Sequence, residues 1–210
     1  RLLAVRGVER VHENFRMELD SAATAGGGAG AGAVGSPAGP AVGTVSASST
    51  STNATYGVDM VRAPEVWERF GTRGEGATVA VLDTGIDPDH PDLTVSGWAE
   101  IDENGRVIQN DSGPYDANGH GTHVAGTVAG GNASGIAIGV APEATVHAIK
   151  VFPDDSRSTT FTRVIGGMEA ALNESVGGGR ADVIQMSLGT NAYVAEVIGP
   201  VRNAEAAGAI

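Results

Sequence analysis

The chain has 210 residues, enough for one domain with a substantial hydrophobic core. Its formal net charge is −12 and it carries no basic stripe, so nucleic acid is excluded as a partner. The absence of cysteine excludes disulfides and cysteine-ligated metals, and no apolar run is long enough to span a bilayer, so no membrane partner is expected.

Three zones follow one another along the chain. Residues 1–20 mix charged and apolar residues, and the stretch VRGVERVHE alternates like a short strand. Residues 21–52 carry no charge and consist of Ala, Gly, Ser, Thr, Val and Pro, which predicts a flexible linker. Residues 53–210 are the predicted globular part. Because the chain does not begin with Met and ends in AAGAI, which resembles the start of a buried strand, we expect a piece of a longer protein.

Inside the globular part, predicted strands alternate with predicted helices. Continuous apolar runs predict buried strands at 77–85, 144–152 and 181–189, and a hairpin at 95–110 turns at Asn104-Gly105. Helices are predicted at 63–70, where Pro64 suits a first turn, and at 120–130, 162–175 and 194–208, the last interrupted by Pro200. This order predicts an α/β fold with a mostly parallel sheet flanked by helices, whose ligands bind beyond the carboxyl ends of the strands.

Asp83 ends the first buried strand, at the edge where open α/β sheets place functional groups. A carboxylate there needs a hydrogen-bonding partner, because an unpaired buried charge is costly. His120 opens the glycine-rich helix in the stretch DANGHGTHVAGT, where the flanking glycines would let a bound peptide come close. If Asp83 holds the Nδ1 proton of His120, Nε2 is left as a general base, and the pair is two thirds of a nucleophilic triad.

His120 and His123 have two other interpretations, a metal site and a plain buried helix. Zinc-binding helices space their histidines at i and i+4 with an adjacent Glu, and this stretch has neither feature. For His123 we favour a buried structural histidine that is hydrogen-bonded locally. His90 is expected at the surface and His147 in a structural role.

The motifs VAVLDTGID and NGHGTHVAGTVAG resemble the Asp and His motifs of the subtilisin-like serine proteases. The similarity extends to YGVDMVRAPEVW, DPDHPDL, GVAPEATVHAIKVF and DVIQMSLG, so it covers essentially residues 53–210. Lys150 is the only lysine in this acidic, Ala- and Gly-rich chain. With that composition, the chain resembles the halolysin-like members of the family. The composition also predicts a salt-adapted protein, because dense carboxylates keep a surface hydrated while salt screens their repulsion.

The resemblance implies a subtilisin-like three-layer fold, incomplete at the C-terminus, in which Asp83 orients the base His120. Ser187, Leu188 and Gly189 are then the strand edge against which a substrate pairs, and Ser187 is not the nucleophile. Phe161 would be an aromatic wall of a distal substrate pocket.

Asp92 would join the loop after the His helix in a structural calcium site. The family's usual Asn in that loop falls at Ala133, next to Asn132, which is a departure from the pattern. No catalytic cofactor is implied.

By the same resemblance, residues 1–20 are the end of an inhibitory propeptide, and residues 53–210 are the N-terminal part of a catalytic domain. The maturation cut would lie in the linker, before Tyr56. The implied function is extracellular hydrolysis of polypeptides by an Asp-His-Ser triad, with the propeptide as a second partner and a monomer as the expected state.

The family's oxyanion Asn and its serine, in a GTSMA-like motif, do not occur in this chain, so the polypeptide alone is expected to be inactive. The alternatives are a non-catalytic peptide-binding protein that has lost its nucleophile and an intracellular subtilisin.

Overall fold

The computed structural model describes residues 16–19, 53–108, 113–190 and 198–210. The predicted strand in VRGVERVHE and the predicted linker at 21–52 lie outside the described residues, and the domain boundaries derived from them stay predictions. Within the described chain, no helix is both long and apolar enough to cross a membrane.

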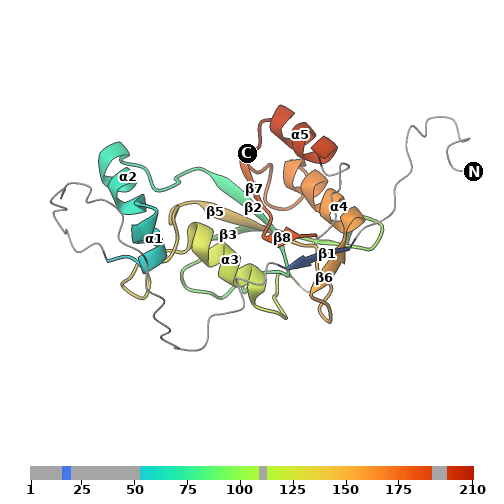
Figure 1. The fold of residues 1–210 in the computed structure, drawn as a ribbon, viewed down its shortest axis with the longest axis horizontal. Helices are drawn as coiled ribbons and strands as arrows, with labels where there is room; N and C mark the ends of the chain where they lie inside the picture. The colour runs from blue at the N-terminus through green and yellow to red at the C-terminus, as the bar shows by residue number, and fades with distance from the viewer. Residues whose placement is uncertain (1–15, 20–52, 109–112, 191–197) are drawn as a thin grey trace, which may run out of the picture.

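The described residues form a central five-stranded sheet with the order β4-β3-β5-β2-β7 (Figure 1). Its neighbours β3, β5, β2 and β7 pair in parallel, and β4 pairs with β3 in antiparallel fashion. The predicted turn at Asn104-Gly105 joins these two, and Gly105 has a φ of 78°. The prediction of a mostly parallel α/β sheet is therefore confirmed. The strands are β2 (Thr78–Asp83), β3 (Val95–Ile101), β4 (Val107–Ile108), β5 (Thr145–Lys150) and β7 (Val183–Gln185).

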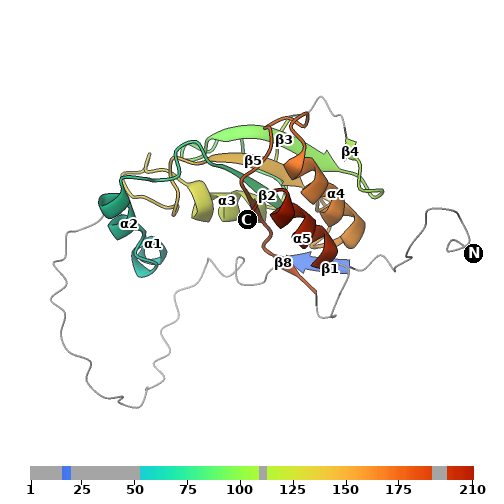
Figure 2. The ribbon, with the colours of Figure 1, turned by 90° about the horizontal axis from the view of Figure 1, so that it is seen from above.

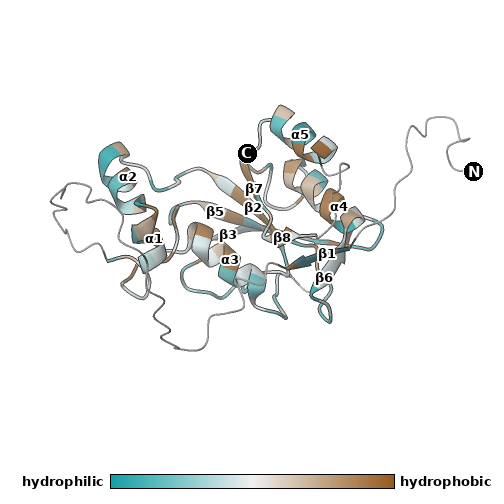
Figure 3. Cartoon of the chain, viewed as in Figure 1, coloured by the Kyte–Doolittle hydropathy of each residue, from teal (hydrophilic) through white to brown (hydrophobic). Residues whose placement is uncertain are grey.

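Both faces of the sheet are covered, which explains why its central strands read as continuous apolar runs. Val79 and Val81 of β2 face α3 (His120–Ala129), whereas Ala80 and Leu82 face α4 (Phe161–Leu172). Figure 2 shows α3 apart from α4 and α5 (Ile198–Ala206). Hydropathy colouring gives brown along the central strands and teal on much of α2 (Figure 3).

Two short helices, α1 (Tyr56–Met60) and α2 (Ala63–Phe70), lie at one end of the molecule (Figure 1). Pro64 occupies the first turn of α2, as predicted, and Gly71 ends that helix in a left-handed conformation. Pro200 lies inside α5, whose described residues run from Ile198 to Ala206. Residues 191–197 lie outside the described residues, so the expected interruption at Pro200 stays a prediction.

The segment 181–189 is two strands in place of the predicted one. After β7 the chain leaves the central sheet, and β8 (Leu188–Gly189) enters a second sheet with the order β6-β1-β8. In that sheet β1 (Arg16–Leu19) pairs in antiparallel fashion with β8 on one side and with β6 (Ser158–Thr160) on the other. The apolar pattern of residues 181–189 continues without a break through both strands, because β7 and β8 are buried to a similar extent. The sequence therefore gave no sign that the chain changes sheets here.

Helix α3 docks on the end of β2 through its first glycine. A Cβ added at Gly121 would lie 2.2 Å from the Gly85 carbonyl oxygen and 3.2 Å from the Cβ of Asp83. At Gly126, one and a half turns further along, the nearest neighbour would be the Cδ1 of Ile138, at 3.9 Å. The first position therefore requires glycine for close approach, and the second does not.

We expect Gly121→Ala to lower the free energy of unfolding by about 2 kcal/mol or more, because the helix must move off the strand. Gly126→Ala is the matched control in the same helix and is expected to raise it by ~0.5 to 1 kcal/mol through helix propensity. Urea denaturation of both variants measures the two effects. Equal destabilisation by both substitutions would contradict the docking account.

Candidate active site

Asp83 and His120 come together at the carboxyl end of β2. The Nδ1 atom of His120 lies 2.7 Å from the Oδ1 atom of Asp83, and both side chains are completely buried. Asp83 is the last residue of its strand and His120 the first residue of α3, so the contact joins two segments distant in sequence. The sequence predicted this pairing, and the structure places the two residues as predicted.

The electrostatics of the pair follow from its burial. Burial raises the pKa of the Asp83 carboxyl, and hydrogen bonds from His120 and from the Thr84 N–H, which lies 2.7 Å from Oδ1, oppose that shift. An ionised carboxylate can only accept hydrogen bonds, so in the charged state Nδ1 of His120 carries the proton. Nε2 of His120 has no hydrogen-bond partner among the described residues, and in that tautomer it presents a lone pair. The pair can therefore accept a proton at Nε2.

Asp116 and Thr84 hold the pair in place, and the sequence analysis missed both. The Oδ1 atom of Asp116 accepts a hydrogen bond from the Thr84 hydroxyl (2.9 Å), and its Oδ2 atom accepts from the hydroxyl (2.7 Å) and the N–H (2.9 Å) of Thr122. The Thr84 hydroxyl in turn accepts from the N–H of Gly121 (2.9 Å). Burial alone would raise the pKa of Asp116, but hydrogen bonds from Thr122 and Gly119 outweigh it and hold this pKa below its ordinary value.

A sequence signal for Asp116 did exist. Gly119 is the N-cap of α3 and has no side chain to accept the unpaired N–H groups of the first turn. An aspartate just before a helix that begins at glycine is a natural substitute acceptor. Asp116 accepts from the N–H groups of Asn118, Gly119 and Thr122, so it caps the helix from outside.

The predicted substrate-binding residues gather around β1. Leu188 and Gly189 form β8, where they pair with Leu19 and Glu18. Phe161 is buried at the start of α4 and belongs to an apolar cluster with Met17 and Leu188. Ser187 lies between β7 and β8, and its hydroxyl is 3.0 Å from the side-chain nitrogen of Gln185, within hydrogen-bonding distance.

The other histidines lie outside this pair. His147 is completely buried in β5, and burial lowers the pKa of its imidazole, with the Gly179 backbone opposing the shift. Its structural role stays a prediction. The expectation that His123 is buried is wrong, because the sheet-facing side of α3 is formed by Val124 and Ala125, and His123 is exposed. His90 is half-buried, and its Nδ1 lies 3.2 Å from the backbone nitrogen of Asp92.

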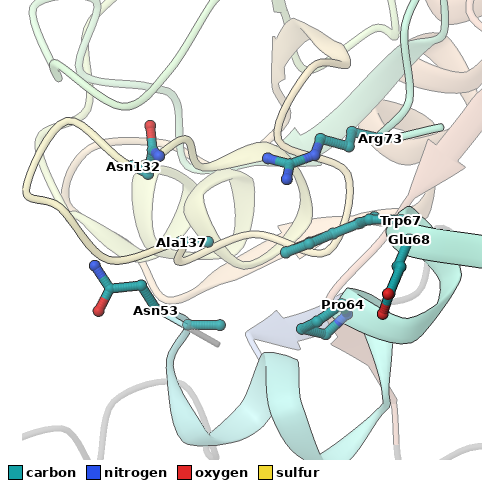
Figure 4. A pocket seen from close by; sticks show the side chains of 8 residues that line it. Asn53, Pro64, Trp67, Glu68, Arg73, Asn132 and Ala137 are labelled. Atoms are coloured by element: carbon teal, nitrogen blue, oxygen red, sulfur yellow. The ribbon is translucent and has the colours of Figure 1, made fainter. Parts of the chain in front are cut away.

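Asp92 contacts the loop that follows α3, as predicted. Its Oδ1 atom accepts a hydrogen bond from the Ala133 N–H, 2.5 Å away, and its carbonyl accepts from Gly131. Asn53 and Asn132 lie at one end of an adjoining pocket of about 380 Å³, with Trp67 and Glu68 at the other (Figure 4). The described residues contain no group of three or more His, Asp or Glu side chains that could hold a metal ion. A structural calcium ion held by Asp92 and this loop stays a prediction.

Comparison with known proteins agrees with this geometry. The family model described as the subtilase family matches residues 74–210. The chain is 40% identical over 152 residues to the major intracellular serine protease of Bacillus subtilis (strain 168), which covers 70% of this chain and 44% of that protein. It is 41% identical over 135 residues to subtilisin E of the same organism (64% and 32%) and 41% identical over 139 residues to thermitase of Thermoactinomyces vulgaris (64% and 44%).

The chain thus spans less than half the length of these relatives. The matched segment still includes the whole central sheet, Asp83, Asp116 and His120, and it covers more than half of the chain. On these grounds the chain belongs to the subtilase family.

Proposed function

We propose that this chain is part of a serine endopeptidase in which Asp83 orients His120 and His120 is the general base. The observation that carries the proposal is the 2.7 Å contact between two completely buried side chains, with Nε2 of His120 left without a partner among the described residues. Such a pair is costly to bury, and perturbed, buried pairs of this kind gather at catalytic sites. Three relatives whose names describe serine proteases or subtilisins support the same activity.

The chemistry requires a serine hydroxyl that this chain does not itself supply in a recognisable motif. Nε2 of His120 takes the hydroxyl proton as the oxygen attacks the peptide carbonyl, and the resulting imidazolium is stabilised by the Asp83 carboxylate. His120 then passes the proton to the leaving amine. The Thr84 N–H keeps the carboxylate aligned throughout, because it donates to the same oxygen that accepts from His120.

The substrate would bind as an extended strand in the place that β1 occupies. A polypeptide lying between β6 and β8 gains main-chain hydrogen bonds on both edges, which requires no particular sequence. Side chains on one face of it must fill an apolar pocket. Met17 does so here, packed against Phe161 and Val164, with Leu188 at the border. We therefore propose polypeptide substrates with a large apolar residue at the position of Met17.

The same observation supports an inhibitory role for residues 1–20. The described part of that segment fills the groove in the manner proposed for a substrate, with Met17 and Leu19 buried and Glu18 exposed. A segment of the chain that occupies its own substrate groove would keep the enzyme inactive until it is cut away.

A non-catalytic peptide-binding protein is the second candidate. The occupied groove favours peptide binding as such, and it would be equally useful to a protein without a nucleophile. The two candidates differ in the role of His120. The endopeptidase needs His120 to hydrolyse peptides, whereas the peptide-binding protein needs only the groove.

We expect His120→Ala, introduced into the full-length gene product, to lower kcat for peptide hydrolysis about 10⁶-fold, because the general base is lost, and Asp83→Asn to lower it about 10⁴-fold, because the imidazole loses its orientation. His123→Ala is the matched control: it removes an exposed histidine from the same helix and should leave kcat unchanged. Assays with a chromogenic peptide measure all three variants. Full activity in His120→Ala would reject the proposal, and peptide binding without hydrolysis by the unaltered protein would establish the second candidate.

A synthetic peptide of residues 10–20 is expected to inhibit the mature enzyme competitively. Replacing Met17 with Asp removes ~2 kcal/mol of apolar burial and should weaken inhibition about 30-fold or more. Glu18→Gln is the matched control, since Glu18 points to solvent in the same strand, and it should change the inhibition constant less than threefold. Equal effects of both changes would mean that the apolar pocket does not hold this segment.

We also propose a structural calcium ion held by Asp92 and the loop that follows α3. The Asn53 amide lies in very close contact with the Gly135 carbonyl oxygen, and the Asp92 carboxylate reaches the same loop at Ala133. Turning the Asn53 amide over would add its oxygen to this group, and oxygens of these kinds are what calcium prefers. The ion would tie residue 53 and Asp92 to one loop, and it has no part in the chemistry.

An extracellular, salt-adapted monomer is the setting we propose for the enzyme. The charge of −12 with a single lysine supports salt adaptation. Subtilisins among the relatives support export, while the relatives also include proteins whose names describe intracellular serine proteases.

One thermal-unfolding experiment tests both the calcium and the salt proposals. At constant ionic strength, a chelator should lower Tm by several degrees and added calcium should restore it, while Asp92→Asn should remove this response. In a separate series without chelator, transfer from molar NaCl to dilute buffer should also lower Tm, because unscreened carboxylates repel one another. A Tm independent of calcium would reject the ion, and a Tm independent of NaCl would reject salt adaptation.

A further inference from the structure

Lys150 carries a buried charge and has no role in the reaction proposed for Asp83 and His120. It is the last residue of β5 and lies in register with Asp83 on the neighbouring strand β2. Only 2% of its side chain is exposed. Removing an ammonium group from water costs several kcal/mol unless it is paired and hydrogen-bonded, so its partners must explain its presence.

The ammonium group of Lys150 contacts three different segments of the chain. Its Nζ atom donates to the Thr84 carbonyl oxygen at 2.6 Å and pairs with the Oδ1 atom of Asp154 at 2.8 Å. It also lies 5.2 Å from the centre of the Tyr115 ring, within range of a cation–π contact. These segments are the turn after β2, the loop after β5 and the loop before α3.

The partners of Lys150 are themselves linked. Burial, together with the nearby Glu100 and Asp154 carboxylates, raises the pKa of Tyr115 to about 12, so its phenol keeps the proton. That hydroxyl donates to the Oδ2 atom of Asp154 at 3.3 Å. Asp154 is half exposed and thus gives the buried ammonium a counter-charge that reaches solvent.

The contact that matters for the active site is the one to Thr84. Every polar group of this residue is engaged: its N–H donates to Asp83, its hydroxyl donates to Asp116 and accepts from Gly121, and its carbonyl accepts from Lys150. Lys150 therefore fixes the carbonyl of Thr84, which belongs to the peptide unit between Thr84 and Gly85. The preceding peptide unit, between Asp83 and Thr84, carries the N–H that aligns the Asp83 carboxylate.

We propose that Lys150 is a positioning residue for Asp83 and His120, acting through the Thr84 carbonyl. This inference rests on the proposed function of the pair. It also explains why a chain that uses arginine at every other basic position has lysine here. A compact ammonium with three donors can face a carbonyl, a carboxylate and a ring in different directions, whereas a planar guanidinium directs its donors in one plane.

The first test compares variants of the full-length protein. Lys150→Met removes the donor and keeps the chain length, and we expect kcat to fall about 100-fold with KM changed less than threefold, as a small misplacement of catalytic groups does. Lys150→Arg keeps the charge and should still lose about 10-fold in kcat, because of its different donor geometry. Ile101→Ala, a core truncation on β3, is the control for general destabilisation and should keep kcat.

An unchanged kcat in well-folded Lys150→Met, or an equal loss in Ile101→Ala, would overturn the inference. His120→Ala separates this failure from that of the proposed function: if His120→Ala is inactive while Lys150→Met is fully active, the pair is catalytic and only the role of Lys150 is wrong.

A second test needs no Lys150 variant and so does not depend on whether one folds. Lysine-selective ¹⁵N labelling of the full-length protein records the lysine side-chain resonances, and that of Lys150 is identified by its proximity to the Tyr115 ring. We expect this ammonium signal to be protected from solvent exchange and to shift in Asp83→Asn, whose altered carboxylate changes the Thr84 turn. A signal that exchanges rapidly, or that is the same in Asp83→Asn, would overturn the inference.

Discussion

The hydrogen bond between Asp83 and His120 is the constraint on which the rest of the structure depends. It brings together two titratable side chains that are completely buried, at a cost that only precise support can offset. The strand β2 provides a rigid base for the carboxylate, and α3 begins at the residue that meets it. Gly85 and Gly121 let the two backbones approach at this point, since a side chain at either would collide with main-chain oxygens.

A buried polar network around Thr84 supplies that support. Asp116 joins the turn after β2 to the first turn of α3, because it contacts the hydroxyls of Thr84 and Thr122. Lys150 contacts the turn after β2 as well, through the Thr84 carbonyl. Networks of this kind are stable only when every member is satisfied, because the low dielectric of the interior penalises any group left alone. Here the Thr84 groups are all satisfied, while Oδ2 of Asp83 and Nε2 of His120 have no hydrogen-bond partner among the described residues.

Under the proposed function, the second sheet is the place where both a substrate and an inhibitory segment would bind. Its middle strand, β1, comes from the start of the chain, and its outer strands border the groove in which a peptide would bind. In the proposed function, main-chain pairing would make the groove tolerant of sequence, and the apolar cluster around Met17 and Phe161 would add a preference.

The sequence by itself determined the α/β class, the hairpin at Asn104-Gly105 and the pairing of Asp83 with His120, because apolar periodicity, turn residues and short motifs are local signals. Only the tertiary structure decided the contacts of Asp116 and Lys150, whose partners lie in other segments, and the exposure of His123, which depends on the side of α3 that meets the sheet. It also decided that 181–189 divides between two sheets and that β1 lies beside β8. Pairing between segments distant along the chain depends on geometry that no local pattern records.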